Sequence, residues 1–381
     1  MSSVVLSDRR ARVQTSPLRH LDLALLGAAF GATAIGQLMI YSSTQARTKA
    51  AHVSALYFVE RQLVATLLGL FVMAAVMAID YRKIRDHAIL VYLATVSALL
   101  VVLSPFGSNA KGAQSWIQLP GGFQFQPSEL AKLGLIIGLA GYLAQHRDGL
   151  DARRVLTAVG IAGVPMALVM LQPDLGTTLV MGVVVLAMLT IAGARPLHLL
   201  VIVLVCVTCA VLVVQRGILK QYQVDRLTAF LDQSSDSSRA TYNLNQSKTA
   251  IGNGGLFGRG YRHGTQTNLA FVPEQHTDFI FTALGEELGF VGGATLLALF
   301  AIVVWRTWRT ALVSPDFFGT IVCIGVLAFF VFQVFENMGM TMGIMPITGI
   351  PLPFMSYGGS AIITEFACLG LVANVSMRRF T

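Results

Sequence analysis

Residues 197 to 214 read LHLLVIVLVCVTCAVLVV, an apolar run of membrane-spanning length. About 20 residues of helix cross the roughly 30 Å of hydrocarbon in a bilayer, and similar runs recur from Leu21 to the C-terminus. They predict about ten spans, at 21 to 42, 62 to 80, 88 to 105, 128 to 145, 155 to 171, 174 to 193, 197 to 214, 277 to 304, 317 to 338 and 355 to 376. We therefore expect an all-α, polytopic membrane protein that forms one domain over residues 1 to 381.

The overall composition supports this fold class. Of the 381 residues, 55% are hydrophobic and 12% are charged, which is about half the charged share of a soluble globular domain. Such a chain cannot build the usual solvated surface, so much of its surface must face lipid.

Positive charge alternates with the predicted spans. With a cytoplasmic N-terminus, fifteen Lys and Arg fall in the inner segments and four in the short outer loops. Short segments rich in Lys and Arg resist translocation, so we expect both termini in the cytoplasm. Segment 215 to 276 then forms one large extracytoplasmic loop, which is long enough to be exempt from this rule. The net charge of +8 is explained by topology, and no nucleic-acid partner is expected.

Cysteine and metal-ligand patterns give no sign of disulfide or metal chemistry. The four cysteines lie in apolar runs, and none lies in the large outer loop. Cys206 and Cys209 form a C-x-x-C, but their apolar surroundings favour a packing role. We expect no disulfide and no dedicated metal site.

Ionisable residues collect at the outward ends of the predicted helices. Glu129 and Lys132 open the fourth helix, Asp174 opens the sixth, and Asp278 opens the eighth. An ionisable group is costly in a bilayer, so each is a candidate functional residue. Glu129 and Lys132 are three residues apart and can form an ion pair on one helix face, either functional or merely structural. Asp174 serves equally well as a helix N-cap.

The stretch PEQHTDFIFTALGEELGF, residues 273 to 290, places several polar side chains before and inside an apolar helix. Thr277 or Asp278 could simply cap that helix. Carboxylates two turns into a span are not expected for packing alone, so a functional role is favoured. The residues concerned are Glu274, His276, Thr277, Asp278, Glu286 and Glu287.

Two loops add to this picture. Residues 251 to 264, IGNGGLFGRGYRHG, contain six glycines with Arg259 and Arg262; backbone N–H groups of such a loop can wrap a phosphate, although turn formation alone also explains the glycines. The last outer loop, residues 345 to 360, contains three prolines that forbid a regular helix. Irregular backbone at membrane depth must be buried in protein or line a cavity. We expect this loop to dip toward the polar cluster, facing Glu336, Asn337 and Glu365.

These motifs together resemble the SEDS family (shape, elongation, division, sporulation), whose members RodA and FtsW polymerise the glycan of peptidoglycan. QPSE, the GTQ at 264 to 266 and the IPLP before SYGG look more like RodA, which implies a role in cell elongation. One departure is Ser115, where the family usually has Arg before the Trp; Lys111 is left as the cation of that loop. The motifs are QPSELAK (126 to 132), QPDLGT (172 to 177), AIGNGGLFGRG (250 to 260), PEQHTDFIF (273 to 281), GEELGF (285 to 290) and PLPFMSYGGS (351 to 360).

The resemblance implies a multi-pass enzyme of the bacterial plasma membrane with an outward-facing cavity. Its substrate would be lipid II, a disaccharide-peptide on undecaprenyl pyrophosphate, and its partner a class B penicillin-binding protein. The glycan would pass to the 4-hydroxyl of an incoming lipid II, with inversion at the anomeric carbon.

The resemblance also assigns roles to residues. Asp278 would be the general base, oriented by Glu129 and Lys132. Lys111, Arg259 or Arg262 would balance the pyrophosphate, a task that a divalent cation (Mg or Mn) could share, although no cofactor is certain. Further substrate contacts are expected at Gln126, Asp174, Glu274, His276, Thr277, Ser356, Gly358, Gly359 and Ser360. Two other readings are a lipid II flippase or transporter, and a non-catalytic scaffold for the penicillin-binding protein.

Overall fold

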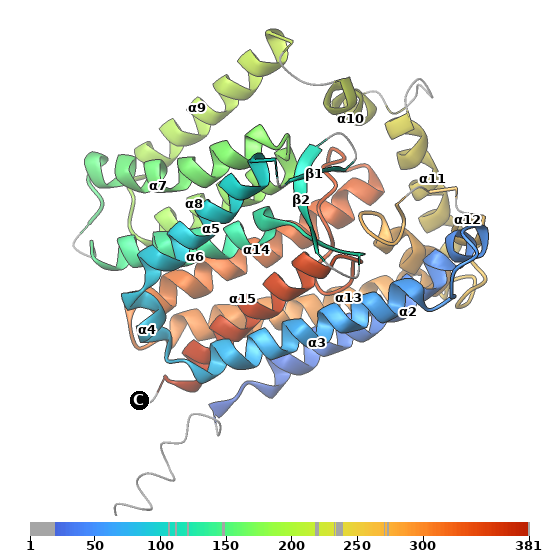
Figure 1. Cartoon of the computed structure of the whole chain (residues 1–381), viewed down its shortest axis with the longest axis horizontal. Coiled ribbons are helices and arrows are strands. Elements are labelled where there is room, and N and C mark those ends of the chain that lie inside the picture. Colours follow the sequence, from blue (N-terminus) through green and yellow to red (C-terminus); the bar gives the residue numbers. More distant parts are fainter. Residues whose placement is uncertain are drawn as a thin grey trace, which may run out of the picture.

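Long helices lie side by side along one axis of the molecule in a computed structural model of the chain (Figure 1). The structure describes residues 20–105, 107–110, 113–119, 122–146, 149–217, 221–231, 233, 239–269, 271–272 and 274–379.

Each predicted span coincides with a helix. Within the described residues, seven helices are long and apolar enough to cross a membrane, and α5 and α8 are shorter apolar helices. α6 carries the predicted Glu129 and Lys132 in its first two turns. The helices are α2 (Leu23–Ala50), α3 (Tyr57–Ala78), α5 (Ala88–Leu103), α6 (Pro127–Ala144), α7 (Ala152–Leu171), α8 (Leu175–Ile191), α9 (Pro196–Gln215), α13 (Ile280–Leu312), α14 (Phe317–Met342) and α15 (Gly359–Met377).

The structure differs from the prediction, which was an all-α fold with one large extracytoplasmic loop, in two features. A three-stranded antiparallel sheet of β1 (Ser108–Ala110), β2 (Ala113–Leu119) and β3 (Phe123–Phe125) connects α5 to α6. β2, AQSWIQL, has no strict alternation of polar and apolar residues, because Gln114 and Ser115 are both polar and Trp116 and Ile117 are both apolar, so it gave no clear strand signal. Segment 215 to 276 carries α10 (Gln221–Leu231), α11 (Arg239–Gly254) and α12 (Thr265–Asn268), and α4 (Tyr81–Asp86) lies between α3 and α5.

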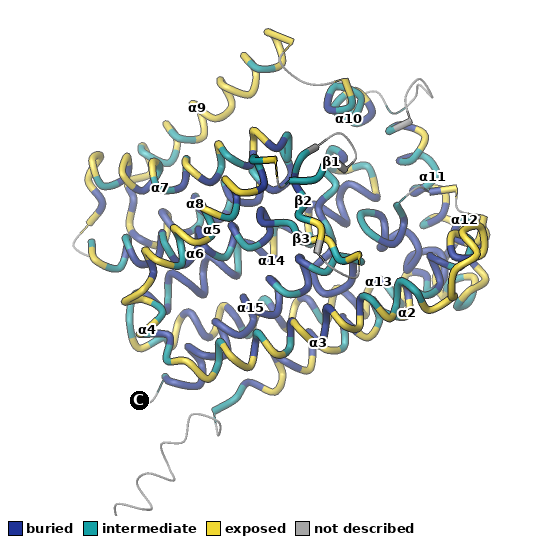
Figure 2. The backbone as a smooth tube through the Cα atoms, in the orientation of Figure 1, coloured by how far each residue is buried: buried dark blue, intermediate teal, exposed yellow. Residues whose placement is uncertain are grey.

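Figure 2 shows that the helices differ in how deeply they are buried, and α15 and α9 are the two extremes among the described helices. α15 is buried over most of its length and packs most extensively on α3. α9, by contrast, has no buried residue along its described length. α15 is therefore the core of the bundle, and α9 offers its Leu and Val side chains to the surroundings.

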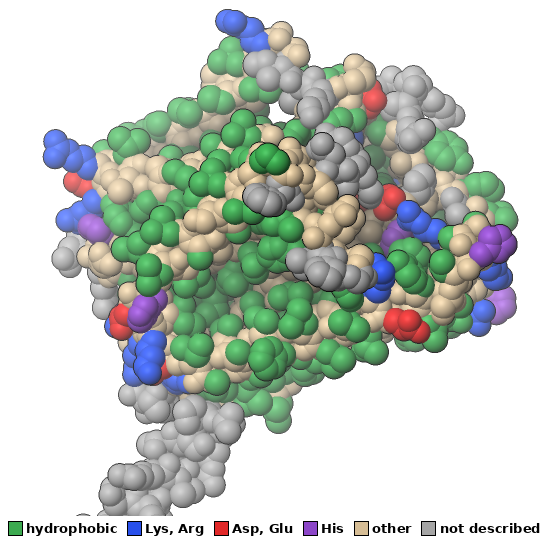
Figure 3. Space-filling view, viewed as in Figure 1, with side chains coloured by type: hydrophobic (Ala, Val, Ile, Leu, Met, Phe, Trp, Pro, Cys, Tyr) green, Lys and Arg blue, Asp and Glu red, His purple; other side chains and the backbone are tan. Residues whose placement is uncertain are grey.

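Figure 3 shows charged side chains gathered at the two ends of the bundle and a hydrophobic surface between them. Many Leu, Val and Phe side chains of the described residues are exposed, including Phe71 at 71% and Leu197 at 66%. An exposed apolar band of this kind fits lipid better than water.

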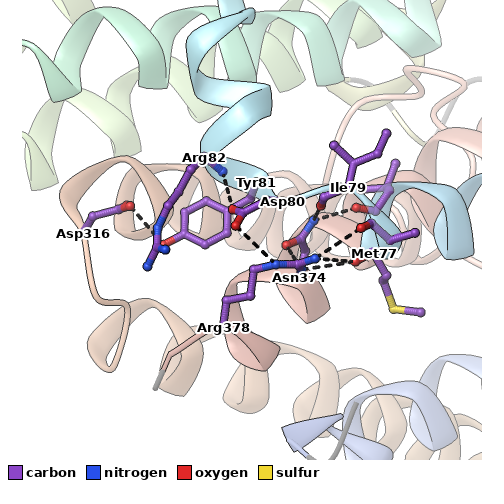
Figure 4. A network of polar contacts seen from close by, with 10 residues as sticks. Met77, Ile79, Asp80, Tyr81, Arg82, Asp316, Asn374 and Arg378 are labelled. Atoms are coloured by element: carbon purple, nitrogen blue, oxygen red, sulfur yellow. Dashed lines mark hydrogen bonds and ion pairs between the residues drawn. The ribbon is translucent and has the colours of Figure 1, made fainter. Parts of the chain in front are cut away.

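A polar network ties α15 to the end of α3 (Figure 4). The last four carbonyls of a helix have no partner within the helix. Asn374 Nδ2 donates to the carbonyls of Val76 and Ile79, both at 2.6 Å, and Arg378 donates to that of Met77 at 3.1 Å. Side chains of α15 thus satisfy the C-terminus of α3.

Hydrogen bonds to two carboxylates link further helix ends near this network. Tyr81 donates to Asp316 at 2.9 Å, and Arg306 donates to Asp22 at 2.6 Å. The starts of α2 and α14 therefore lie at the same end of the bundle as the ends of α3, α13 and α15. The charge pattern assigns all of these segments to one side of the membrane.

Candidate active site

The segment that contains Asp278 is held in place by its backbone. Its carbonyls accept hydrogen bonds from Asn337 and from the last outer loop, so contacts to the main chain fix the position of this segment. Three consecutive carbonyls take part: His276 accepts from the Tyr357 amide (2.8 Å), Thr277 from Ser356 Oγ (2.6 Å) and Asp278 from Asn337 Nδ2 (2.8 Å).

The capping alternative for this motif is wrong. α13 begins at Ile280, and its N-cap residue, Phe279, makes no side-chain capping hydrogen bond. Thr277 Oγ1 donates to the carbonyl of Glu274 at 3.0 Å. Asp278 therefore does not occupy the N-cap position.

The last outer loop approaches the polar cluster, as predicted, and three buried side chains hold it. Asn337 donates a second hydrogen bond to the Ile350 carbonyl (2.7 Å), Glu336 accepts from Thr348 Oγ1 (2.9 Å), and Glu365 accepts from the Phe354 amide (2.7 Å). The predicted inward orientation of these three residues is confirmed.

Gln62 of α3, which the sequence analysis missed, clamps the same loop. Its Nε2 donates to the Ser356 carbonyl and its Oε1 accepts from the Gly358 amide, both at 3.1 Å. The side chain is only 2% exposed. A buried Gln in an apolar run was the available signal, because a buried amide needs partners.

A second residue that the sequence analysis missed, Arg226 of α10, lies near Asp278. A Cβ placed on Gly349 would lie 3.2 Å from Asp278 Oδ2 and 3.5 Å from Arg226 Nη1. The carboxylate and the guanidinium therefore both border the bare backbone of Gly349. Nη1 of Arg226 also donates to the Thr348 carbonyl at 3.0 Å.

The predicted residues Gln126, Asp174 and Ser360 come together beside this pair. Asp174 caps α8 by accepting from the Thr177 amide at 2.9 Å, which confirms the N-cap alternative. Gln126 donates from its side chain to Asp174 (3.4 Å) and from its amide to Ser360 Oγ (2.8 Å). The starts of α6, α8 and α15 thus share one polar surface.

Glu129 and Lys132 form the predicted ion pair, 2.8 Å long, with both side chains buried. The Lys132 ammonium lies 5.1 Å from the ring centre of Phe329, and the pair is close enough to Glu365 to interact with it electrostatically. Glu365 in turn holds the Phe354 amide. The pair is thus connected to the Asp278 segment through the last outer loop.

Glu286 and Glu287, expected to be functional, hold other parts of the chain. Glu286 accepts from the amides of Gln266 (2.8 Å) and Thr267 (2.9 Å) at the start of α12. Glu287 accepts from the Ser42 hydroxyl on α2. Both carboxylates have structural partners, which explains their presence inside α13.

The glycine-rich loop is bound to α13. The amides of Arg259 and Gly260 donate to the carbonyls of Glu286 (2.9 Å) and Glu287 (3.0 Å), and the Gly258 amide donates to Gly254 (2.8 Å). The phosphate-cradle hypothesis is therefore wrong for these three amides. The roles predicted for the Arg259 and Arg262 side chains stay predictions.

The other predicted residues that the structure describes make contacts of their own. Glu274 pairs with Arg47 at 3.7 Å, and the buried His276 ring contacts Phe58. Gly359 is the first residue of α15. Ser115 donates to the Gln172 carbonyl at 3.3 Å, and Lys111 lies outside the described residues.

Among the residues described, no group of three or more His, Cys, Asp or Glu could hold a metal ion, and the divalent cation stays a prediction.

Comparison with known proteins identifies the family of this chain. The sequence model of the "Cell cycle protein" family that includes FtsW, RodA and SpoVE matches residues 23–380. The chain belongs to this family. These are the SEDS proteins, so the resemblance seen in the motifs is confirmed.

Named relatives are similar over nearly their whole length. The probable peptidoglycan glycosyltransferase FtsW of Geobacter metallireducens is 36% identical, over 96% of this chain and 97% of its own. The peptidoglycan glycosyltransferase MrdB of Escherichia coli K12 is 35% identical, over 94% of each chain.

Solved structures share the fold. A chain from work on how a peptidoglycan synthase complex coordinates polymerization and crosslinking has a TM-score of 0.78 and 31% identity, over 95% of this chain and 99% of that chain. The rod shape determining protein RodA of Thermus thermophilus has a TM-score of 0.70 and 29% identity, over 95% and 98%. The SEDS protein described here is thus a multi-pass membrane protein.

Proposed function

We propose that this SEDS peptidoglycan glycosyltransferase polymerises lipid II into glycan strands and that Asp278 is its general base. The observation that carries the proposal is the backbone clamp on residues 276 to 278. It fixes the backbone that carries the Asp278 carboxylate at the end of an apolar helix bundle, one residue before the N-cap position of α13.

The chemistry requires one proton acceptor and one leaving group. The 4-hydroxyl of the incoming lipid II gives its proton to the Asp278 carboxylate as its oxygen attacks the anomeric carbon of the growing strand. The bond from that carbon to the diphosphate oxygen breaks, and its electron pair leaves with undecaprenyl diphosphate. A positioned general base contributes roughly 10²- to 10⁴-fold to such a step.

The wider setting of the reaction follows from the same resemblance. Ten membrane crossings with both termini in the cytoplasm would place the Asp278 segment on the outer side, where the disaccharide of lipid II lies. The RodA-like motifs favour a role in cell elongation. A class B penicillin-binding protein is the proposed partner, which is supported by the similarity to a chain of a peptidoglycan synthase complex.

Purified protein, with its partner supplied, should be assayed for glycan product and for lipid II binding. We expect Asp278→Asn to lower polymerisation by roughly 10²- to 10⁴-fold with little change in binding, because Asn cannot take the proton. Glu60→Gln, which neutralises an exposed carboxylate of α3, is the matched control.

The same assay separates the alternative functions. Lipid II translocation without product by the wild-type protein would identify a flippase, and neither activity would identify a scaffold. Polymerisation by Asp278→Asn within a few fold of wild type would remove Asp278 from the mechanism.

A further inference from the structure

Helix α10, which belongs to the large segment between α9 and α13, is anchored beside the proposed base. Tyr222 donates from its hydroxyl to the Pro173 carbonyl at 3.2 Å, and Arg226 donates to the Thr348 carbonyl at 3.0 Å. These two residues are four apart and share one face of the helix. Just beyond α10, Gln233 donates to the Gly343 carbonyl at 3.0 Å. The position of the Arg226 guanidinium is therefore set by contacts on both sides.

The guanidinium and the proposed base both border Gly349. A Cβ at that position would lie 3.5 and 3.6 Å from the two terminal nitrogens of Arg226, and 3.2 Å from Asp278 Oδ2. Its φ of 77° is also one that residues other than glycine rarely adopt. A cation and a carboxylate thus share one small space at the end of the bundle.

The two groups suit opposite ends of one glycosyl transfer. A carboxylate accepts the proton of the attacking hydroxyl, and a cation is needed where negative charge develops on the departing diphosphate. Arg presents five N–H donors in a planar fork that fits phosphate oxygens, and one of its nitrogens here is bound to a neutral carbonyl.

The other candidate cations have different surroundings. Arg262 donates to Gln45 at 3.2 Å and lies over the Tyr41 ring on α2. The amide of Arg259 is fixed on α13. Neither contact places these residues near Asp278, whereas Arg226 and Asp278 both border Gly349.

We propose that Arg226 binds the diphosphate of the lipid-linked donor and stabilises the charge that forms on it when the glycosidic bond breaks. This proposal rests on the proposed function for its chemistry. Its test is a binding measurement, which does not depend on turnover.

The full-length protein in lipid nanodiscs should be titrated with undecaprenyl diphosphate and, separately, with undecaprenyl monophosphate. We expect Arg226→Gln to weaken diphosphate binding by roughly 10- to 100-fold, Arg226→Lys to recover part of the loss, and the monophosphate to be affected less. Asp278→Asn should bind diphosphate at least as tightly as wild type, because a like charge is removed. Arg216→Gln, which removes an exposed cation at the end of α9, is the matched control.

Anionic lipid is the competing source of phosphate. Nanodiscs with and without phosphatidylglycerol should give the same factor for Arg226→Gln if the site prefers diphosphate. A factor that disappears without the anionic lipid would overturn the proposal.

Two further outcomes would also overturn it. One is diphosphate affinity of Arg226→Gln within twofold of wild type. The other is an equal loss for diphosphate and monophosphate together with a lowered melting temperature, which would make Arg226 a structural partner of Thr348. The wild-type protein could also bind diphosphate in a way that depends on Arg226 and yet make no glycan. This result would contradict the proposed function but support the diphosphate site.

Discussion

Asn337→Leu tests whether the backbone clamp on Asp278 matters for the reaction. The Asn337 side chain is fully buried and donates from one nitrogen to the carbonyls of Asp278 (2.8 Å) and Ile350 (2.7 Å). Leu has the same number and branching of side-chain heavy atoms but no donor, so both hydrogen bonds are lost.

The chain contains a matched control at the opposite end of the bundle. Asn374 is equally buried and also bridges two carbonyls, those of Val76 and Ile79, each at 2.6 Å. A buried carbonyl that loses its partner costs about 1 to 3 kcal/mol. Each Asn→Leu variant should therefore lose about 2 to 6 kcal/mol of stability, since each leaves two carbonyls without this donor. Asn374→Leu also removes the acceptor of a hydrogen bond from Arg378.

Their effects on the reaction should differ. Loss of the clamp lets the base shift, and a misplacement of about 1 Å can cost about 10²-fold in rate. We expect the polymerisation rate of Asn337→Leu to fall about 10²-fold and that of Asn374→Leu to change by less than about threefold. Thermal unfolding and glycan synthesis on lipid II, both measured in detergent, compare the two variants directly. Equal rates for variants of equal stability would refute the idea that the clamp positions Asp278.

Three other predictions address the ion pair, the topology and the cytoplasmic end. Breaking a buried ion pair leaves an uncompensated charge, so Glu129→Gln and Lys132→Met should each lower polymerisation activity strongly. The double variant should lose less activity than the sum of the two single losses. Additive losses would show that the two residues do not act as a unit. An impermeant maleimide should label Thr228→Cys in intact cells and Lys83→Cys only after lysis, and the reverse pattern would invert the proposed orientation. Burial is the largest cause that raises the pKa of Tyr81 from 10.0 to about 12, and its hydrogen bond to Asp316 is the second. The contribution of Tyr81 to folding stability is therefore complete below pH 10 and is lost as the pH rises toward 12. Tyr81→Phe should lower the unfolding free energy at pH 8 by about 1 kcal/mol; unchanged unfolding at that pH would rule out this contribution.

The helices and the buried ion pair could be predicted because local sequence determines them. Apolar length decides which segments can cross a bilayer. The spacing of Glu129 and Lys132 places them on one helix face whatever the rest of the chain does. The inward orientation of Asn337 followed from the cost of a polar side chain facing lipid.

Contacts between distant segments could not be predicted in the same way. Arg226 lies in a polar stretch of the large segment 215 to 276. In such a stretch the sequence alone predicts that an arginine side chain is exposed to solvent. Its position next to Gly349, which Asp278 also borders, depends on how α10 docks on Pro173 and Thr348. The strands 108 to 125 were missed because three short β-strands between long apolar helices carry too few residues for a period-two signal.

The last outer loop connects the demands of the membrane to those of the reaction. Its prolines keep it irregular, and irregular backbone near a bilayer must find hydrogen-bond partners within the protein. Gln62 and Asn337 supply such partners from α3 and α14, and Ser356, which is part of the loop, turns its own hydroxyl toward the Thr277 carbonyl. Because Asn337 uses one nitrogen for both Ile350 and Asp278, the contact that satisfies the loop also positions the proposed base. A mutation that relaxes this loop should therefore reduce catalysis even when it touches no substrate.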